Sequence, residues 1–282
     1  MSTTKATVWL QDLGKGDLCS PFVNELDGSL YVILQKSGEI LSVNTFGQTQ
    51  RAYSTGGQPS SAAFDHENGR LLVADFAHGA VLALTPDGQQ ESLVAVYEDK
   101  PLKGPNSITV APSGAIFFSD SGALGETGLH SPTGSLFVIT TARGPGPSSS
   151  SLLKPLTLGT LAYPAGIASA GRFLYVAETM ANRVVRYFQQ PEGVYHGSVF
   201  FQLSGGVGPS CLAVDAQGSV YVGVFETRDS GSTAGKVLIL SSAGALVGTI
   251  VTAGPEVSGL AISGNTLYIT ERSTGSVSKV SL

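Results

Sequence analysis

The sequence predicts an all-β protein, a six-bladed β-propeller with four antiparallel strands in each blade. One pattern recurs six times: a turn, led by proline in five copies, is followed by a short hydrophobic strand. The copies are spaced by about 47 residues on average, the length of a four-stranded blade. No segment has a sustained 3.6-residue period, so helix is expected to be nearly absent. The copies are Pro21 with 30–32, Pro59 with 71–73, Pro105 with 116–118, Pro164 with 174–176, Pro209 with 220–222, and Val257 with 267–269.

The second repeat illustrates how the strands of one blade are assigned. Short apolar or alternating runs are bounded there by Gly, Pro, Asn and Asp, the residues that end strands in turns. The expected strands are 61–64, 71–74, 80–84 and 92–96, with turns at 67–69 and 86–88.

The two ends of the chain complement each other. The sixth repeat stops after its third strand, 276–280, whereas a spare strand of sequence ATVWL, about 6–10, precedes the first repeat. We expect this N-terminal strand to complete the last blade, because an open sheet edge invites aggregation. Trp9 would then be a packing residue at the closure. Residues 1–282 are accordingly expected to form a single domain.

Composition excludes several classes of partner and points to a cytoplasmic location. Hydrophobic residues make up 42% and charged residues 13% of the chain, with a net charge of −5. Without a basic patch, neither nucleic acid nor an anionic membrane is an expected partner. No apolar run reaches transmembrane length, and the polar segment Met1–Thr7 does not resemble a signal peptide. Two cysteines in different repeats give no disulfide framework, which favours a reducing compartment.

The geometry of a blade places its functional loops on one face. The first two strands form a hairpin, so the start of the first strand and the end of the second share a face with the loop between strands two and three. Two of these loops are long, 121–134 and 225–235. Long ordered loops often carry function, so a protein partner or a small-molecule ligand is expected on this face.

Two segments carry a resemblance to a known superfamily. The segment Phe173–Tyr187 (FLYVAETMANRVVRY) and the segment Gly104–Gly122 (GPNSITVAPSGAIFFSDSG) resemble the senescence-marker-protein, gluconolactonase and strictosidine-synthase type of six-bladed propeller, with NHL-like repeats. The resemblance covers nearly the whole chain. It implies the fold and says little about the reaction, because one propeller hosts many functions.

The resemblance implies a divalent cation, often calcium, at the mouth of the central channel. In the gluconolactonase branch its ligands are a Glu in blade one, an Asn in blades three and four, and an Asp in blade five. The corresponding positions here are Cys19, Asn106, Ala165 and Ser210, of which Asn106 alone matches. Both carboxylates that a hard cation would use are replaced. We therefore expect no cofactor and an incomplete metal site at Asn106, where a divalent cation such as calcium is disfavoured though not ruled out by the sequence.

Two functions are compatible with the loss of these cation ligands. The first is a propeller that has lost the calcium site and acts as a binding scaffold for a ligand or a protein. The second is a lactonase or esterase-like hydrolase whose site is rebuilt around Asn106 with Glu178, Glu226 or Glu271. Metal content and calcium-dependent stabilisation would discriminate between them.

Other candidate residues also allow two interpretations. Asp75, Asp120, Glu178 and Glu271 end second strands, where they could form a ring of carboxylates or accept hydrogen bonds from turn N–H groups. His130, in the first long loop, could be a general base or a solvated residue. Cys19 and Cys211 are expected to be buried packing residues, because neither has a nearby His or cation in sequence to activate a thiolate.

Overall fold

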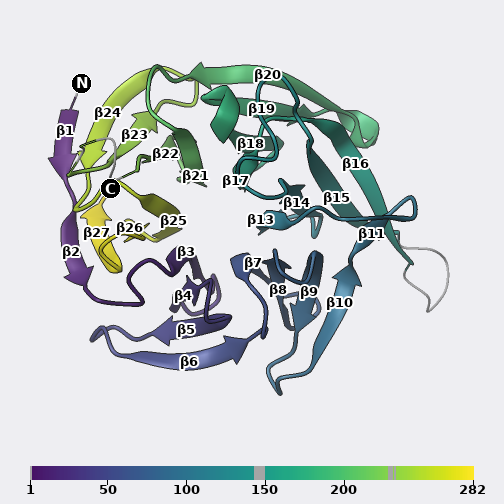
Figure 1. Ribbon diagram of the computed structural model, residues 1–282, viewed down its shortest axis with the longest axis horizontal. Coiled ribbons are helices and arrows are strands. Elements are labelled where there is room, and N and C mark those ends of the chain that lie inside the picture. Colours follow the sequence, from purple (N-terminus) through teal and green to yellow (C-terminus); the bar gives the residue numbers. More distant parts are fainter. Residues whose placement is uncertain (1, 143–149, 228–230, 232) are drawn as a thin grey trace.

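Six small sheets surround a central channel in the computed structural model, which describes residues 2–142, 150–227, 231 and 233–282 (Figure 1). Each blade has four antiparallel strands, which follow chain order from the channel outward in blades one to five, while the N-terminal β2 is the outer strand of blade six; the predicted six-bladed propeller is confirmed. The innermost strands are β3, β7, β13, β17, β21 and β25. The first three blades comprise β3 (Leu18–Val23), β4 (Leu30–Leu34), β5 (Glu39–Val43), β6 (Thr49–Ser54), β7 (Pro59–Asp65), β8 (Arg70–Asp75), β9 (Ala80–Leu84), β10 (Gln90–Val94), β13 (Pro105–Val110), β14 (Ile116–Asp120), β15 (Gly134–Ala142) and β16 (Ser150–Leu161).

The remaining blades repeat the same order. They comprise β17 (Pro164–Ala170), β18 (Phe173–Glu178), β19 (Arg183–Gln189), β20 (Tyr195–Gln202), β21 (Gly208–Val214), β22 (Val220–Phe225), β23 (Lys236–Leu240), β24 (Leu246–Val251), β25 (Val257–Ser263), β26 (Thr266–Glu271) and β27 (Ser276–Ser281). A two-stranded hairpin, β11 (Val96–Tyr97) and β12 (Lys100–Pro101), follows blade two. Helix is confirmed to be nearly absent: η1 (Thr179–Ala181) and η2 (Pro191–Gly193) are single 3-10 turns. In the described part of the chain, no helix has the length and apolar character needed to span a bilayer.

The hydrophobic core lies between adjacent blades rather than inside any one of them. One cluster joins Leu72 and Val81 of blade two to Phe118 and Phe137 of blade three. The two phenylalanine rings stack with centroids 5.2 Å apart. Because each blade buries its faces against its neighbours, no blade has a complete core alone, and the ring must close to be stable.

The N-terminal strand closes the ring as predicted. Strand β2 (Thr7–Leu10) pairs antiparallel with β27, with Thr7 opposite Lys279, and forms the outer strand of blade six. Trp9 packs at this closure: the Lys279 ammonium lies 3.2 Å from the centre of its ring, and the Tyr268 ring centre lies 6.0 Å away. Cation–π contacts of this kind add to the strand pairing.

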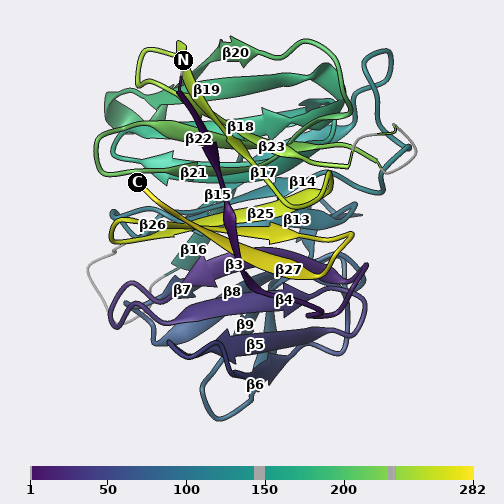
Figure 2. The same ribbon diagram turned by 90° about the vertical axis from the view of Figure 1, so that its left-hand side faces the viewer.

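A further strand, β1 (Ser2–Lys5), was not expected from the sequence. It runs parallel to β24 and adds a fifth strand to blade five, so the N-terminal segment bridges blades five and six (Figure 2). All four of its residues are exposed. The segment therefore lacks the apolar alternation by which strands are recognised, and it forms a strand by covering an open edge.

Each innermost strand begins with a β-bulge that faces the channel. At each bulge one residue has no partner on the second strand, and it is partly exposed between two buried neighbours. Bulges re-aim a side chain in this way. The bulge residues are Ser20, Ser60, Asn106, Ala165, Ser210 and Ser258.

The bulges revise how blade one fits the repeat. Pro59 immediately precedes the bulge residue, as do the prolines of blades three to five, whereas Pro21 follows the bulge residue inside β3. The unpaired residue of blade one is consequently Ser20, while Cys19 is paired with Ile33. The sequence pattern alone does not reveal this shift of one position.

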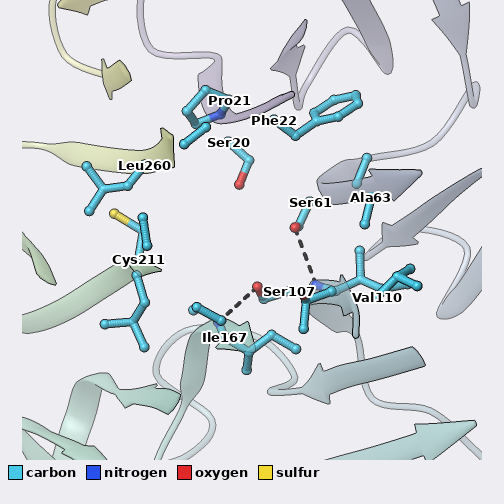
Figure 3. Close-up of a pocket in the computed structure, with 18 of the residues that line it drawn as sticks. Ser20, Pro21, Phe22, Ser61, Ala63, Ser107, Val110, Ile167, Cys211 and Leu260 are labelled. Atoms are coloured by element: carbon cyan, nitrogen blue, oxygen red, sulfur yellow. Dashed lines mark hydrogen bonds between the residues drawn. The ribbon is translucent and has the colours of Figure 1, made fainter. Parts of the chain in front are cut away.

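Side-chain hydrogen bonds link every pair of adjacent blades around the channel. Each joins a hydroxyl or thiol of one blade to the backbone of the next, and two of them are drawn in Figure 3. The bonds are Cys19 Sγ to Pro59 O (3.8 Å), Ile108 N to Ser61 Oγ (3.3 Å), Ile167 N to Ser107 Oγ (3.1 Å), Thr179 Oγ1 to Pro209 O (2.7 Å), Ser210 Oγ to Val257 O (2.7 Å) and Ser258 Oγ to Leu18 O (3.1 Å).

Two glycines show how closely the innermost strands approach. A Cβ added to Gly166 would lie 2.7 Å from Cys211 Cα and 3.0 Å from Ser210 O in the next blade. A Cβ on Gly259 would lie 2.7 Å from the backbone Cα of Ser20 and 2.2 Å from Pro21 Cδ. Only glycine fits at such backbone-to-backbone contacts.

We predict that Gly166→Ala destabilises the protein by about 1–3 kcal/mol, because the added methyl group must push two innermost strands apart. Gly128→Ala is the matched control, since a Cβ at Gly128 would meet nothing within 4 Å. Urea unfolding followed by circular dichroism measures both. Equal unfolding midpoints for the two variants would contradict the close approach.

Trp9→Ala is expected to lower the free energy of unfolding by about 1–3 kcal/mol, because the ring covers the closure of blade six. Thr4→Ala, at an exposed position of β1, should change it by less than about 0.5 kcal/mol. Circular dichroism is the appropriate probe, since Trp9 is the only tryptophan. A Trp9→Ala protein as stable as Thr4→Ala would show that the closure does not depend on this ring.

Candidate functional site

The channel encloses a cavity of about 580 Å³. The bulge residues, Gln35, Tyr163 and Arg272 line one end of it, where the innermost strands begin; we call this end the mouth. Glu25, in the turn after β3, lies at the opposite end. Between the two ends the innermost strands present Phe22, Ala63, Val110, Ile167 and Leu260 (Figure 3). The cavity is therefore polar at the mouth, and farther along the innermost strands these apolar side chains line it together with the hydroxyls of Thr109 and Ser169.

Asn106 is part of a small polar cluster at the mouth. Its amide nitrogen donates to Ser121 Oγ at 3.0 Å and to the Tyr163 hydroxyl at 3.3 Å. Its carbonyl oxygen has no hydrogen-bond partner among the residues that the structure describes. The cluster can therefore still accept a hydrogen bond at the mouth.

The other three positions singled out in the sequence offer little to a ligand. Ala165 has no polar side-chain atom. The Ser210 hydroxyl donates to Val257 O at 2.7 Å, within the ring of inter-blade bonds. Cys19 packs in the core and is only 3% exposed, and its thiol points to the backbone of Pro59. None of the three supplies a carboxylate.

Neither cysteine is suited to nucleophilic chemistry. Burial raises the pKa of the Cys19 thiol to about 12, although the charge of Arg272 opposes the shift. Burial likewise raises the pKa of Cys211 to about 12. Both residues are protonated near neutral pH and, since both are buried, serve as packing residues.

Four buried carboxylates anchor the loops that lead into the innermost strands. Each ends the second strand of its blade and accepts a hydrogen bond from a backbone N–H just before the first strand of the same blade. The acceptors are Asp75 from Gln58 N (3.0 Å), Asp120 from Gly104 N (2.7 Å), Glu178 from Ala162 N (2.8 Å) and Glu271 from Glu256 N (2.9 Å). The cavity lining, as far as it is described, contains none of them. The arrangement is that of turn acceptors rather than of a carboxylate ring around the mouth.

The two aspartates respond differently to burial. Burial raises the pKa of Asp120, and the N–H groups of Lys103 and Gly104 offset this only in part. At Asp75, burial also acts to raise the pKa, but hydrogen bonds from the His78 N–H, the Thr55 hydroxyl and the Gln58 N–H outweigh it, so the pKa is lowered. Neither carboxylate is arranged to exchange a proton with a ligand in the channel.

The long-loop candidates also lie away from the channel. His130 is exposed in the loop between β14 and β15. Glu226 is half-buried, and its N–H donates to Pro255 O. Neither contributes to the described lining of the cavity. Residues 228–230 and 232 of the second long loop lie outside the described residues.

Arg272, which follows Glu271 at the end of β26, brings a positive charge to the mouth. Its Nη2 donates to Gln35 Oε1 at 3.1 Å, and Gln35 in turn donates to Ser60 Oγ at 2.9 Å. Its Nε is shielded from solvent without an acceptor. No carboxylate of the described residues pairs with it. In the sequence, the feature that could have indicated this residue is its position directly after Glu271, the acidic residue that ends the second strand of blade six.

Tyr163 has a strained backbone at the mouth. Its φ is 59°, in the left-handed region, directly before Pro164. The equivalent residues of blades three and five are Gly104 and Gly208, with φ of 147° and 138°. An aromatic residue with positive φ costs of order 1–3 kcal/mol and is often found at functional sites. Burial raises the pKa of the Tyr163 hydroxyl, although the hydrogen bond from Asn106 and the charge of Arg272 oppose this rise. The hydroxyl therefore remains a neutral hydrogen-bonding group.

Solved structures of several enzymes and binding proteins have a similar fold. A gluconolactonase of Xanthomonas campestris superposes with a TM-score of 0.77 at 20% identity, covering 99% of this chain and 95% of that one. A luciferin-regenerating enzyme gives 0.79 at 17% identity, covering 98% and 95%. The calcium-binding protein regucalcin of Agrobacterium tumefaciens gives 0.78 at 17% identity, covering 99% and 95%. These likenesses show the fold.

Sequence comparison agrees. Protein strictosidine synthase-like 13 of Arabidopsis thaliana is 26% identical over 179 residues, which is 60% of this chain. The match spans 41% of the length of that relative. The region from Cys19 to Ser273 matches the family described as SMP-30/Gluconolactonase/LRE-like region. With most of its 282 residues inside that match, the chain belongs to the SMP-30/gluconolactonase/LRE-like family.

Proposed function

We propose that this chain binds a small ligand at the mouth of the channel without a divalent cation, as a binding member of its family rather than a metal-dependent hydrolase. The observation that carries the proposal is the chemistry of the mouth. The four positions Cys19, Asn106, Ala165 and Ser210 contain no carboxylate, and the Ser210 hydroxyl is already bonded to Val257. Hard cations take oxygen ligands whose carboxylates supply the charge. The residues present do not fit calcium or magnesium.

The electrostatics of the mouth also favour ligand binding without a divalent cation. Arg272 places a fixed positive charge in the cavity lining, where a divalent cation would be repelled. The described residues also contain no group of three or more His, Cys, Asp or Glu side chains that could hold a metal ion. A ligand in this channel would meet a guanidinium, a tyrosine hydroxyl and an amide instead.

A hydrolase rebuilt around Asn106 is the competing function. It would need a general acid or base beside that residue. The carboxylates of Glu178 and Glu271 are bonded to loop N–H groups, and Glu226 does not reach the described cavity lining. These positions favour binding over hydrolysis.

We predict that calcium leaves the thermal stability of the metal-stripped protein unchanged. A specific site filled at about 100 times its dissociation constant would add about 2.7 kcal/mol, which is a rise in melting temperature of about 5 °C or more. Differential scanning calorimetry after EDTA dialysis, with and without calcium, measures the shift. Elemental analysis of the purified protein gives its metal content.

Asn106→Ala is the matched variant for this experiment. A stoichiometric metal in the wild type, with a calcium-dependent rise in melting temperature that Asn106→Ala abolishes, would contradict the proposal. Turnover of lactones or aryl esters that Asn106→Ala abolishes would favour the hydrolase instead. Equal, small responses of both proteins would reflect calcium binding elsewhere.

A further inference from the structure

The guanidinium of Arg272 has unused hydrogen-bonding capacity at the mouth. An arginine carries five N–H donors. One hydrogen bond, from Nη2 to Gln35, is formed, and the Cys19 thiol is a second neighbour of the guanidinium, while Nε has no acceptor among the described residues. Nε is sealed from solvent, and the Arg272 side chain as a whole is half-buried. The guanidinium thus presents donors to the cavity that it lines.

No carboxylate of the described residues forms an ion pair with the positive charge of Arg272. The ion pairs of the described residues involve other arginines, such as Arg70 with Asp65 and Arg183 with Glu178. The adjacent Glu271 carboxylate is instead bonded to the loop, accepting from the N–H groups of Glu256, Ser273 and Thr274. Leaving a partly buried charge unpaired is unfavourable, so an anion at the mouth would relieve that cost.

Polar groups on the opposite side of the ring face the same cavity. Blade six, which carries Arg272, lies across the channel from blade three, which carries Asn106 (Figure 1). The Tyr163 hydroxyl accepts a hydrogen bond from Asn106, and Tyr163 also lines the cavity. A ligand held by Arg272 would therefore meet neutral hydrogen-bonding groups on its other side.

Charge and shape together define the class of ligand. Arg272 is the one lysine or arginine in the described lining of the cavity. Its single positive charge can balance a ligand with one negative charge, but not both charges of a phosphate dianion. Beyond the mouth, Phe22, Val110 and Leu260 line a passage that suits hydrocarbon. The cavity of about 580 Å³ is the size of common small-molecule sites.

We infer that the mouth is a binding site for small organic carboxylates, with the carboxylate on Arg272 and the hydrocarbon body of the ligand in the apolar part of the channel. This inference rests on the proposed metal-independent binding and names its ligand class. Gln35 is a positioning residue here, because its bond to Nη2 holds the guanidinium over the cavity.

Calorimetric titration with hexanoate and with its uncharged counterpart hexanamide tests the inference. Hexanoate is expected to bind with a dissociation constant of about 1 mM or tighter, and hexanamide about 10- to 100-fold more weakly, since a charge-assisted hydrogen bond is lost. Inorganic phosphate, as a third probe, should bind more weakly than hexanoate. No detectable hexanoate binding, or equal binding of the acid and the amide, would overturn the inference, as would tighter binding of phosphate.

Three variants locate the effect. Arg272→Gln should abolish the preference for hexanoate over hexanamide, and Arg272→Lys should retain part of it because the charge remains. Arg51→Gln is the matched control: it removes the same charge from an exposed position on β6, and it should bind hexanoate like the wild type. Melting curves of the variants verify that each is folded. A preference for hexanoate that survives Arg272→Gln would overturn the inference.

Titrations in the presence of EDTA separate this inference from the proposed function. Hexanoate binding that EDTA removes would mean that a metal holds the carboxylate, which contradicts the proposed function itself. Binding that persists in EDTA but does not depend on Arg272 would contradict only the carboxylate site. Binding that persists in EDTA and requires Arg272 supports both.

Discussion

The close contact of the six innermost strands around the channel is the constraint on which the rest of the structure depends. Adjacent strands approach so closely that Gly166 and Gly259 admit no Cβ, and a side-chain hydrogen bond links each blade to the next. These bonds use the residues at and beside the bulges. Buried backbone carbonyls that lost such partners would be left unsatisfied, at a cost of about 1–3 kcal/mol each. The ring thus fixes the channel and its mouth together.

This constraint explains why the mouth differs from the cation site that the family resemblance implied. Ser210 donates to Val257 of the next blade, and Cys19 points to the backbone of blade two. Residues at two of the four ligand positions therefore contribute to blade-to-blade contacts. Asn106 differs from both: its amide nitrogen donates to Ser121 of its own blade and to the Tyr163 hydroxyl at the entry to blade four, and its carbonyl oxygen has no partner among the described residues.

The sequence predicted the architecture better than the site, for physical reasons. The repeat, the turns and the closing strand 6–10 are local patterns, and they predicted every blade. Strand β1 was missed because an exposed edge strand has no apolar period. Arg272 and Tyr163 were missed because their importance comes from contacts between neighbouring blades. Arg272 acts with Gln35, which is 237 positions away in the chain, and no local pattern reveals that pair.

The two ends of the channel carry opposite charges, and this difference determines the orientation in which a charged ligand would bind. Arg272 lies at the mouth, whereas Glu25 and Glu67 lie in turns at the opposite end. The chain as a whole carries a net charge of −5, so an anion is weakly repelled at long range and attracted only near the mouth. An amphipathic ligand would therefore be stable in one orientation, with its negative group at the mouth. In the reverse orientation that group would approach two carboxylates, and the attraction of Arg272 would be lost.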